Sequence, residues 1–257
     1  ALVLAAALAE LVPAYHAANP TAPDEVLTAP PPLAAPILAA DDRRLLDVAR
    51  DHPDALVAAR RLRRNGPTRF GVEYFSGFES APPLLQEVQM LAMLEAAPDE
   101  LVDLAGRASV RWLVVDAPLD DPRVRLAGTD AGALLYEHTR ARPRCYVLRG
   151  EAVEPARLEV LAPTRLRART RLASPGRLVV AHAWYPGWSA TSGGRELELE
   201  LVEDLFMGVD LPAGEHVVEL TFEDPELEHG LRLSAAGWLL WALALVLVRR
   251  RGAPAAG

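Results

Sequence analysis

The sequence predicts an α+β protein, with a small α/β domain over residues 41–150 followed by an antiparallel β-sandwich over residues 151–230. A partial N-terminal and a complete C-terminal transmembrane helix are expected to flank these two domains. Three observations support this prediction. Residues 231–248 are almost purely apolar and end at three arginines. Residues 41–150 combine helical periodicity with a short, mostly apolar strand, and residues 151–230 alternate with period two between Pro–Gly turns.

The chain opens on Ala1–Val12, which is apolar except for Glu10. This pattern predicts the outer end of a transmembrane helix over residues 1–17, and a plain amphipathic helix is the alternative. Prolines then recur through residues 18–40. Proline removes a backbone donor and disfavours regular structure, so an extended connector is expected there.

Helices and one buried strand are expected within residues 41–150. Apolar spacing predicts helices over 53–64, 83–97 and 100–106, the last with Asp99 as its N-cap. Val110–Val115 reads VRWLVV, and six residues this apolar are typical of a strand covered on both faces. Two further short strands are expected over 134–137 and 145–148.

Period-two alternation characterises the expected sandwich. Thr164–Leu172 reads TRLRARTRL and Glu196–Leu201 reads ELELEL, so each places one charge sign on one face of a strand. Turn signals such as Pro175-Gly176 and Gly193-Gly194 separate such segments. Five or more short strands at this spacing predict an antiparallel sandwich.

Near the C-terminus, residues 231–248 are long enough as a helix, at roughly 27 Å, to cross the hydrocarbon core of a bilayer. Arg249, Arg250 and Arg251 follow at once, and such a cluster favours the cytoplasmic side. The sequence therefore predicts a transmembrane helix over 231–248, a cytoplasmic tail over 249–257, and extracytoplasmic placement of both domains in the cell membrane. A buried helix of a soluble domain is the alternative.

Composition narrows the function classes. The net charge of −8 argues against a nucleic-acid partner. All 27 basic residues are arginine, and Cys145 is the one cysteine, which excludes an internal disulfide and a CxxC zinc site. The six histidines are scattered and none stands at metal-ligand spacing, so no metal site and no cofactor is expected.

The alternating arginines suggest anion binding, because guanidinium forks match phosphate oxygens. The four side chains on this face are Arg165, Arg167, Arg169 and Arg171. The favoured alternative is a cross-strand ladder of ion pairs with the glutamates of the ELELEL segment, Glu196, Glu198 and Glu200. Such a ladder would mainly fix strand register, since exposed ion pairs add little stability.

The densest aromatic cluster contains Trp184, Tyr185 and Trp188 around Pro186-Gly187. One interpretation is a platform on which glycan rings stack. The other, which the Pro–Gly centre favours, is a tight turn flanked by core aromatics.

Carboxylates also follow the VRWLVV strand, at Asp116, Asp120 and Asp121. Such a group suggests a cation site, but a solvated loop is favoured. Cys145 lies in a short apolar segment, and we expect an inert core thiol.

Several of these motifs, taken in order, resemble the C-terminal part of the YfhO family of bacterial membrane proteins. The most specific are Gly176–Val180 leading into Tyr185-Pro186-Gly187-Trp188, and Leu211–His216 before the last helix. The weaker matches are Ala1–Val12 with Asn19-Pro20, Ser76-Gly77-Phe78, Leu101–Val115, Leu135-Tyr136-Glu137, Arg142-Pro143-Arg144 and Gly208-Val209. The family usually carries an Asp where this chain has Ser192, which puts a catalytic role for this turn in doubt.

The resemblance implies a multi-spanning glycosyltransferase of the GT-C type that uses a polyprenyl-phosphate sugar and a cell-envelope glycan acceptor. In GT-C enzymes the catalytic carboxylate lies in an outer loop near the first helices, so no residue of this chain is expected to be catalytic. The alternative is a non-catalytic module, anchored in the lipid bilayer, that binds a glycan or a protein.

Overall fold

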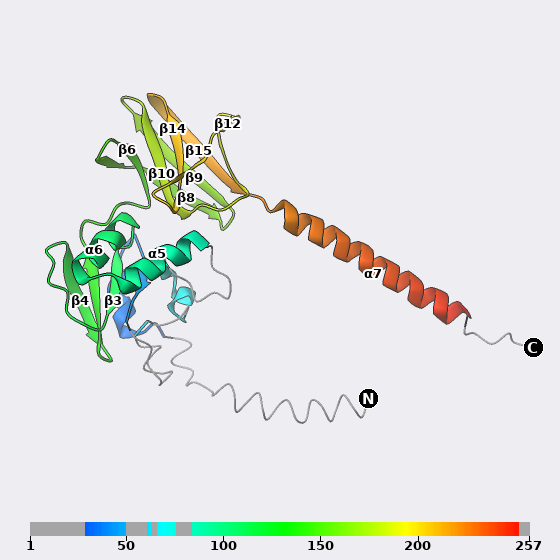
Figure 1. Ribbon diagram of the computed structural model, residues 1–257, viewed down its shortest axis with the longest axis horizontal. Coiled ribbons are helices and arrows are strands. Elements are labelled where there is room, and N and C mark those ends of the chain that lie inside the picture. The colour runs from blue at the N-terminus through cyan, green and yellow to red at the C-terminus, as the bar shows by residue number, and fades with distance from the viewer. Residues whose placement is uncertain (1–28, 50–60, 63–65, 76–83, 252–257) are drawn as a thin grey trace, which may run out of the picture. The chain divides into compact units, whose positions relative to one another are not determined.

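The computed structural model describes residues 29–49, 61–62, 66–75 and 84–251, and in its last helix it leaves out the side chains of 225, 228 and 242–251. The chain divides into two compact units, Ala1–Arg144 and Cys145–Gly257. The first holds one mixed sheet with helices, and the second holds two antiparallel sheets followed by a long helix (Figure 1). A mixed chain with a β-sandwich, as the sequence predicts, is confirmed.

The sheet of the first unit has the strand order β2-β1-β3-β5-β4. β1 pairs in parallel with β2 and β3, whereas β5 pairs antiparallel with β3 and β4. The predicted VRWLVV strand is confirmed as β3, all four of whose residues are buried. The strands are β1 (Arg44–Asp47), β2 (Glu73–Tyr74), β3 (Trp112–Val115), β4 (Val124–Asp130) and β5 (Ala133–His138).

Two helices, α5 (Leu84–Glu95) and α6 (Pro98–Arg107), lie between β2 and β3 in the chain. α6 begins at Pro98, because proline suits the first helical position, so Asp99 lies in the first turn and no side chain caps the helix. The predicted Asp99 cap is therefore wrong. α5 buries Met93 and leaves an apolar face exposed, made of Leu84, Val88, Leu91 and Leu94.

The predicted extended connector is wrong for its last part. A 3₁₀ turn η1 (Pro32–Ala34) leads into a short helix α3 (Ala35–Leu38), since proline is tolerated in a first helical turn. Leu33, Ala34 and Ile37 are buried in one cluster with Leu45, Trp112 and Leu135 of the sheet. Proline density indicated an absence of structure, but three apolar side chains in this segment complete the core.

Other predicted segments lie outside the described residues. These are the membrane helix over 1–17, most of the helix over 53–64, and Ser76-Gly77-Phe78.

His138, at the end of β5, is 3% exposed. Its Nε2 lies 3.1 Å from the carbonyl oxygen of Val102 and its Nδ1 accepts the N–H of Arg140, which together define a neutral ring with the proton on Nε2. A Cβ on Gly106 would lie 2.7 Å from Nε2, so glycine leaves the space for this ring. Burial lowers the pKa of His138 below its ordinary value of 6.5.

We expect this histidine to make the first unit less stable in mild acid. The unfolded chain binds the proton more readily than the folded chain, so the free energy of unfolding falls as pH drops below about 6.5. To test this, the urea concentration at the midpoint of unfolding is measured at several pH values between 7.5 and 5, for the wild type and for H138N. A wild-type midpoint that shifts no more than that of H138N would contradict this account.

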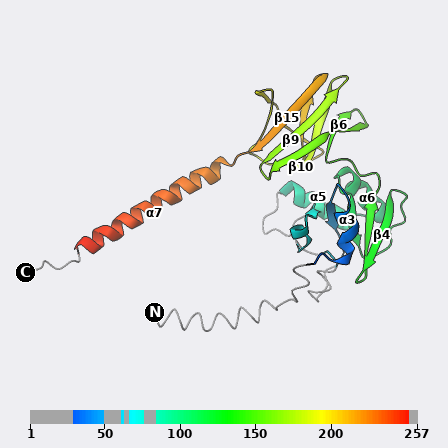
Figure 2. The ribbon, with the colours of Figure 1, turned by 180° about the vertical axis from the view of Figure 1, so that it is seen from behind.

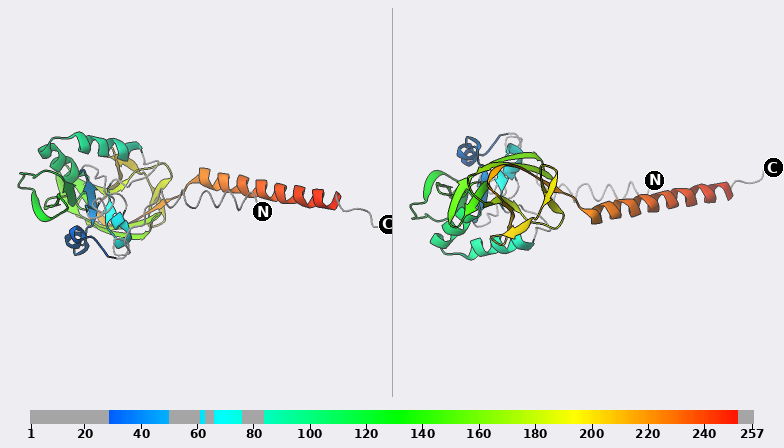
Figure 3. Two further views of the ribbon diagram at one scale, coloured as in Figure 1. Left: turned by 90° about the horizontal axis from the view of Figure 1, so that it is seen from below. Right: turned by 90° about the horizontal axis from the view of Figure 1, so that it is seen from above.

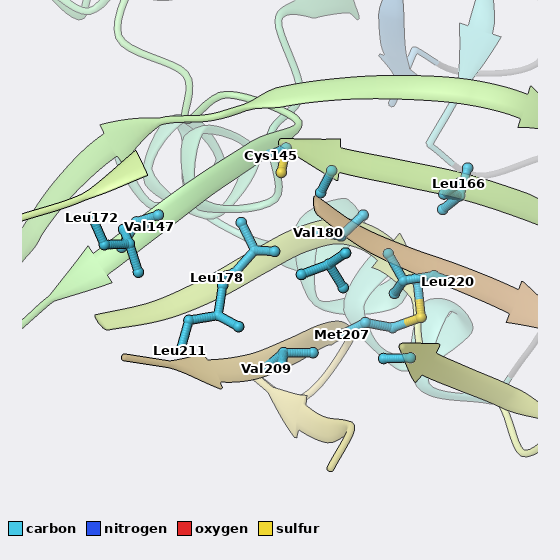
Figure 4. Close-up of a cluster of buried hydrophobic side chains, with 13 residues drawn as sticks. Cys145, Val147, Leu166, Leu172, Leu178, Val180, Met207, Val209, Leu211 and Leu220 are labelled. Atoms are coloured by element: carbon cyan, nitrogen blue, oxygen red, sulfur yellow. The ribbon is translucent and has the colours of Figure 1, made fainter. Parts of the chain in front are cut away.

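The second unit is a sandwich of two five-stranded antiparallel sheets, ordered β13-β14-β10-β6-β7 and β12-β11-β15-β9-β8. Figure 4 shows side chains from both sheets meeting in one core, among them Val147, Leu178 and Met207 from the first sheet and Leu166 and Leu220 from the second. The strands are β6 (Cys145–Arg149), β7 (Ala152–Pro155), β8 (Arg157–Ala162), β9 (Arg165–Leu172), β10 (Gly176–Ala183), β11 (Trp188–Ser192), β12 (Arg195–Leu197), β13 (Glu200–Val202), β14 (Phe206–Leu211) and β15 (Gly214–Phe222).

Two features of the sandwich differ from the prediction. β6, which the sequence assigned to the α/β domain, pairs with β10 and β7, so the units divide before Cys145 and not after Gly150. The ELELEL segment is not one strand. β12 pairs with β11 in one sheet and β13 with β14 in the other, so the chain crosses between the sheets at residues 198–199.

The last helix, α7 (Pro225–Arg251), is confirmed as a helix and begins six residues before the predicted start at 231. The Asp224 carboxylate accepts the N–H groups of Glu226 and Leu227, both at 3.0 Å, and so caps it. Figure 3 shows α7 as one uninterrupted helix from two directions.

In the part of the chain that the structure describes, no helix is both long enough and apolar enough to span a membrane. The predicted span over 231–248 lies partly outside that description, because the side chains of 242–251 are not part of it. Of the predicted tail over 249–257, residues 252–257 lie outside it altogether.

Candidate functional site: the aromatic turn and the arginine face

The aromatic cluster forms the turn between β10 and β11. Trp188 donates its N–H to the carbonyl oxygen of Tyr185 at 3.3 Å, which closes a four-residue turn. Pro186 stands at its second position and Gly187, with φ of +110°, at its third. A turn with proline second and a positive φ third requires glycine there, so the sequence dictates this geometry locally.

Two of the three rings at this turn belong to the core. Trp184 and Trp188 are half-buried and pack against the sandwich core. The His182 ring meets Trp188 edge-on at 5.3 Å, and Phe222 of β15 lies 5.5 Å from Trp188. The predicted tight turn flanked by core aromatics is therefore what the structure has.

Tyr185 is the most exposed ring of the three that the sequence proposed for glycan stacking. It is 49% exposed, and its centroid lies 6.1 Å from that of Phe222. Glycan stacking on Trp184, Tyr185 and Trp188 stays a prediction, with Tyr185 as its best-presented ring.

The turn is tied to the start of α7. Glu223 donates its N–H to the carbonyl oxygen of Gly187 at 3.0 Å. A Cβ on Gly187 would lie 2.3 Å from the Glu223 carbonyl oxygen, a distance that no side chain tolerates. Glycine at position 187 therefore keeps the turn in direct contact with Glu223, one of the two residues that join β15 to α7.

The four arginines of β9 alternate with the buried residues Leu166, Ala168 and Leu172, as the period-two pattern predicts. The neighbours of β9 are β8 and β15, so the predicted partners from the ELELEL segment are wrong. The ion-pair ladder itself is confirmed with other glutamates. Its members are Arg167–Glu219 at 2.7 Å, Arg169–Glu159 at 3.4 Å, Arg171–Glu215 at 3.6 Å and Arg167–Glu159 at 4.0 Å.

Arg165 differs from the other three. It is exposed, it stands opposite Thr221 on β15, and among the described residues no carboxylate lies within ion-pair distance of it. Anion binding on this face stays a prediction, and Arg165 is the residue best placed for it because the other guanidinium groups already face carboxylates.

The carboxylates after β3 do not gather around one point. Asp116 bonds to Arg61, and Asp121 forms charge-assisted hydrogen bonds to Arg123 that hold the pKa of Asp121 at about 2. In the described ranges, no group of three or more His, Cys, Asp or Glu side chains is placed to hold a metal ion. Cys145 is buried in the core, and burial raises the pKa of its thiol to about 12, which keeps it protonated.

The sequence did not predict an open groove of about 750 Å³ at the end of the sandwich away from the aromatic turn. Arg177 forks onto Asp210 with distances of 2.6 and 2.7 Å, which lowers the pKa of the Asp210 carboxyl, and it also meets Glu200 at 2.9 Å. Arg149 donates to Ser174 at 3.2 Å. Arg177 is thus paired with Asp210 and Glu200, whereas the Nε of Arg149 is buried without a hydrogen-bond partner among the described residues. No motif in the sequence indicates that the turn at residue 150 and the turn over 174–176 meet.

Comparison of the chain with protein-family models, with curated proteins and with solved structures finds no match. The features of the chain that bear on its function are therefore its own residues: the last helix, the turn near its start and the charges around them.

Proposed function

We propose that this chain is the extracytoplasmic C-terminal region of a multi-spanning membrane protein of the cell envelope. Its α/β unit and sandwich are held at the outer surface of the bilayer by α7. The protein as a whole would be similar to glycosyltransferases that use a polyprenyl-phosphate sugar, and these two units would help to receive the glycan acceptor.

The observation that supports this proposal most is that α7 is long and exposes a row of apolar side chains. The helix has 27 residues, about 40 Å of length, which exceeds the hydrocarbon thickness of a bilayer. Its described apolar side chains from Leu231 onward include Leu233 at 75% and Leu239 at 72% exposure. Burying a leucine or tryptophan side chain is worth about 1.5–3 kcal/mol, so this row of exposed side chains favours an apolar surrounding.

The orientation follows from the charges at the two ends of α7. Arg249, Arg250 and Arg251 close the apolar stretch, and a cluster of arginines beside a span favours the cytoplasmic side. Asp224 and Glu226 stand at the other end, next to the sandwich. The sandwich would accordingly lie outside.

The test substitutes arginine for two leucines of the same helix. Leu240 lies near the centre of 231–248, and Leu227 precedes it; they are 68% and 60% exposed, so a helix in water would accept both changes equally. An arginine at the centre of a span opposes insertion by about 2.5–3.5 kcal/mol. We expect protease treatment of proteoliposomes to leave a protected peptide over 231–248 in the wild type and in L227R. L240R should lose it, and an equal yield from both variants would contradict the proposal.

A non-catalytic anchored module that binds glycan or protein is the second candidate, and the half-exposed Tyr185 ring favours it. The reading frame upstream of the codon for Ala1 distinguishes the two. Many further apolar spans with an aspartate in an early outer loop support the enzyme, whereas a single anchor supports the binding module.

A further inference from the structure

The aromatic turn belongs to the end of the sandwich from which α7 leaves. β15 ends at Phe222 and α7 begins at Pro225, so two residues separate them. Figures 1 and 2 show α7 leaving the sandwich where β15 ends. The bond from Glu223 to Gly187 keeps the turn beside this junction. The aromatic turn is therefore held by a hydrogen bond to Glu223, which lies two residues before α7, and the Tyr185 ring packs on Phe222, the last residue of β15.

Arg165 lies at the same end, on the outer face of the second sheet. It opens β9 and faces Thr221, the residue before Phe222, while Thr164 accepts the N–H of Phe222 at 2.9 Å. This end of the sandwich therefore carries both an exposed arginine without an ion-pair partner in the described chain, whose fork suits a phosphate, and a half-exposed tyrosine, whose ring is amphipathic.

If α7 spans the bilayer, the spacing along α7 places this end at the outer edge of the headgroup layer. Residues 225–230 precede the apolar stretch and account for about 9 Å of helix. The headgroup layer on each side of a bilayer is about 5–8 Å thick. Tyrosine and tryptophan are enriched in this layer because their rings are apolar and their tips are polar.

From these observations we propose that the α7-proximal end of the sandwich rests on the outer headgroup layer, with Tyr185 between headgroups and Arg165 on a lipid phosphate. This proposal rests on the proposed function, since it requires α7 to be in the bilayer. It gives the sandwich a fixed orientation on the membrane surface, which a flexible tether would not provide.

The charge at this end selects the lipid. Exposed carboxylates flank the turn at Glu203, Asp204, Glu223, Asp224 and Glu226. These carboxylates repel a surface of anionic lipids. The contact therefore depends on the tyrosine ring and on one phosphate rather than on a basic patch. A zwitterionic surface is consequently the preferred one, and added anionic lipid weakens the contact.

The experiment places a fluorescent probe at either end of the sandwich. The full chain carries C145A with P186C, beside Tyr185, or with R171C, at the far end of β9 where Arg171 is 84% exposed. The labelled proteins are reconstituted into phosphatidylcholine vesicles whose headgroups carry a nitroxide quencher. S189C, exposed at the α7-proximal end, gives a second labelling position should P186C disturb the turn.

We expect quenching at position 186 to exceed that at position 171 by about threefold or more, because nitroxide quenches only at near contact distance and only one probe lies in the headgroup layer. Adding Y185S or R165S, or replacing part of the lipid by phosphatidylglycerol, should lower it. Equal quenching at the two ends, with the protected peptide over 231–248 present, overturns this docking and leaves the proposed function standing. Loss of the protected peptide overturns both.

Discussion

Replacing Gly187 by alanine is expected to lower the free energy of unfolding of the sandwich by about 3 kcal/mol or more. The residue has φ of +110°, a region that residues with a Cβ avoid, and its Cβ would lie 2.3 Å from the Glu223 carbonyl oxygen. That oxygen is backbone at the junction with α7, so relief requires the turn or the junction to move. Urea unfolding of the full chain in detergent, followed by tryptophan fluorescence, measures the effect.

Gly193 is the matched control, because it also has a positive φ, at +57°, but nothing lies within 4 Å of an added Cβ. G193A should therefore lower the free energy of unfolding only by the cost of a residue with a Cβ at positive φ, about 1 kcal/mol. If G187A and G193A lose the same stability, the contact between the turn and the junction does not constrain the sandwich.

Replacing Glu73 by glutamine is expected to lower the free energy of unfolding of the first unit by about 2–3 kcal/mol. The guanidinium of Arg44 is 5% exposed and donates to the Glu73 carboxylate at 3.1 and 3.3 Å and to the Ala108 carbonyl oxygen at 3.2 Å. Arg144 also bonds to this carboxylate. E73Q takes from this buried cation the carboxylate to which it donates, and the half-exposed position of Glu73 keeps the loss below that of a fully buried pair.

Two comparisons test this explanation. Adding R44M to E73Q should recover part of the lost stability, because the uncompensated charge is then removed. E215Q, which breaks the exposed Arg171–Glu215 pair, should change stability little. A double variant as unstable as E73Q, measured by urea unfolding, would contradict the role assigned to the buried charge.

The Glu73 carboxylate also makes the stability of the first unit depend on pH in the acid range. Burial alone would raise the pKa of Glu73, but the attraction of Arg44 and Arg144 outweighs burial, and the pKa lies below its ordinary 4.5. The unfolded chain therefore takes up the proton first, and the stability that Glu73 contributes is lost as pH falls below about 4.5. Because burial lowers the pKa of His138 from its ordinary 6.5, the loss that His138 causes begins below about pH 6.5, at higher pH than the loss that Glu73 causes.

Local patterns predicted those parts of the fold that depend on a few neighbouring residues. VRWLVV predicted a buried strand because four consecutive apolar residues, Trp112–Val115, leave no face for water, and TRLRARTRL predicted β9 because its charges and apolar residues alternate. Pro186-Gly187 gave a tight turn because only glycine accepts the positive φ at its third position.

The sequence failed where a segment's partner lies far along the chain. β6 is apolar enough for either domain, and only its pairing with β10, about 30 residues later, assigns it to the sandwich. The arginines of β9 pair with glutamates of β8 and β15 and not with the ELELEL run, because strand pairing, which the sequence pattern does not indicate, determines the partners. Ile37 and its neighbours fill a core built by strands up to 100 residues away, which proline density alone does not indicate.

Only the local part of the candidate site was predicted, because the rest depends on contacts between residues far apart in the chain. The aromatic turn was found from five consecutive residues, whereas the groove beside Arg177 and Asp210 joins three separate turns. The contact from Glu223 to Gly187, which links the turn to α7, spans 36 positions and leaves no local signal.

Sidedness tests the central claim, that lipid surrounds α7 and the sandwich lies outside, most directly. In intact cells that express the full chain, a cysteine introduced at Arg171 and an epitope placed after Gly257 would be probed with reagents that do not cross the membrane. The account predicts labelling at position 171 and none of the epitope until the cells are opened. An epitope reached in intact cells, or a position 171 that stays unlabelled, would contradict it.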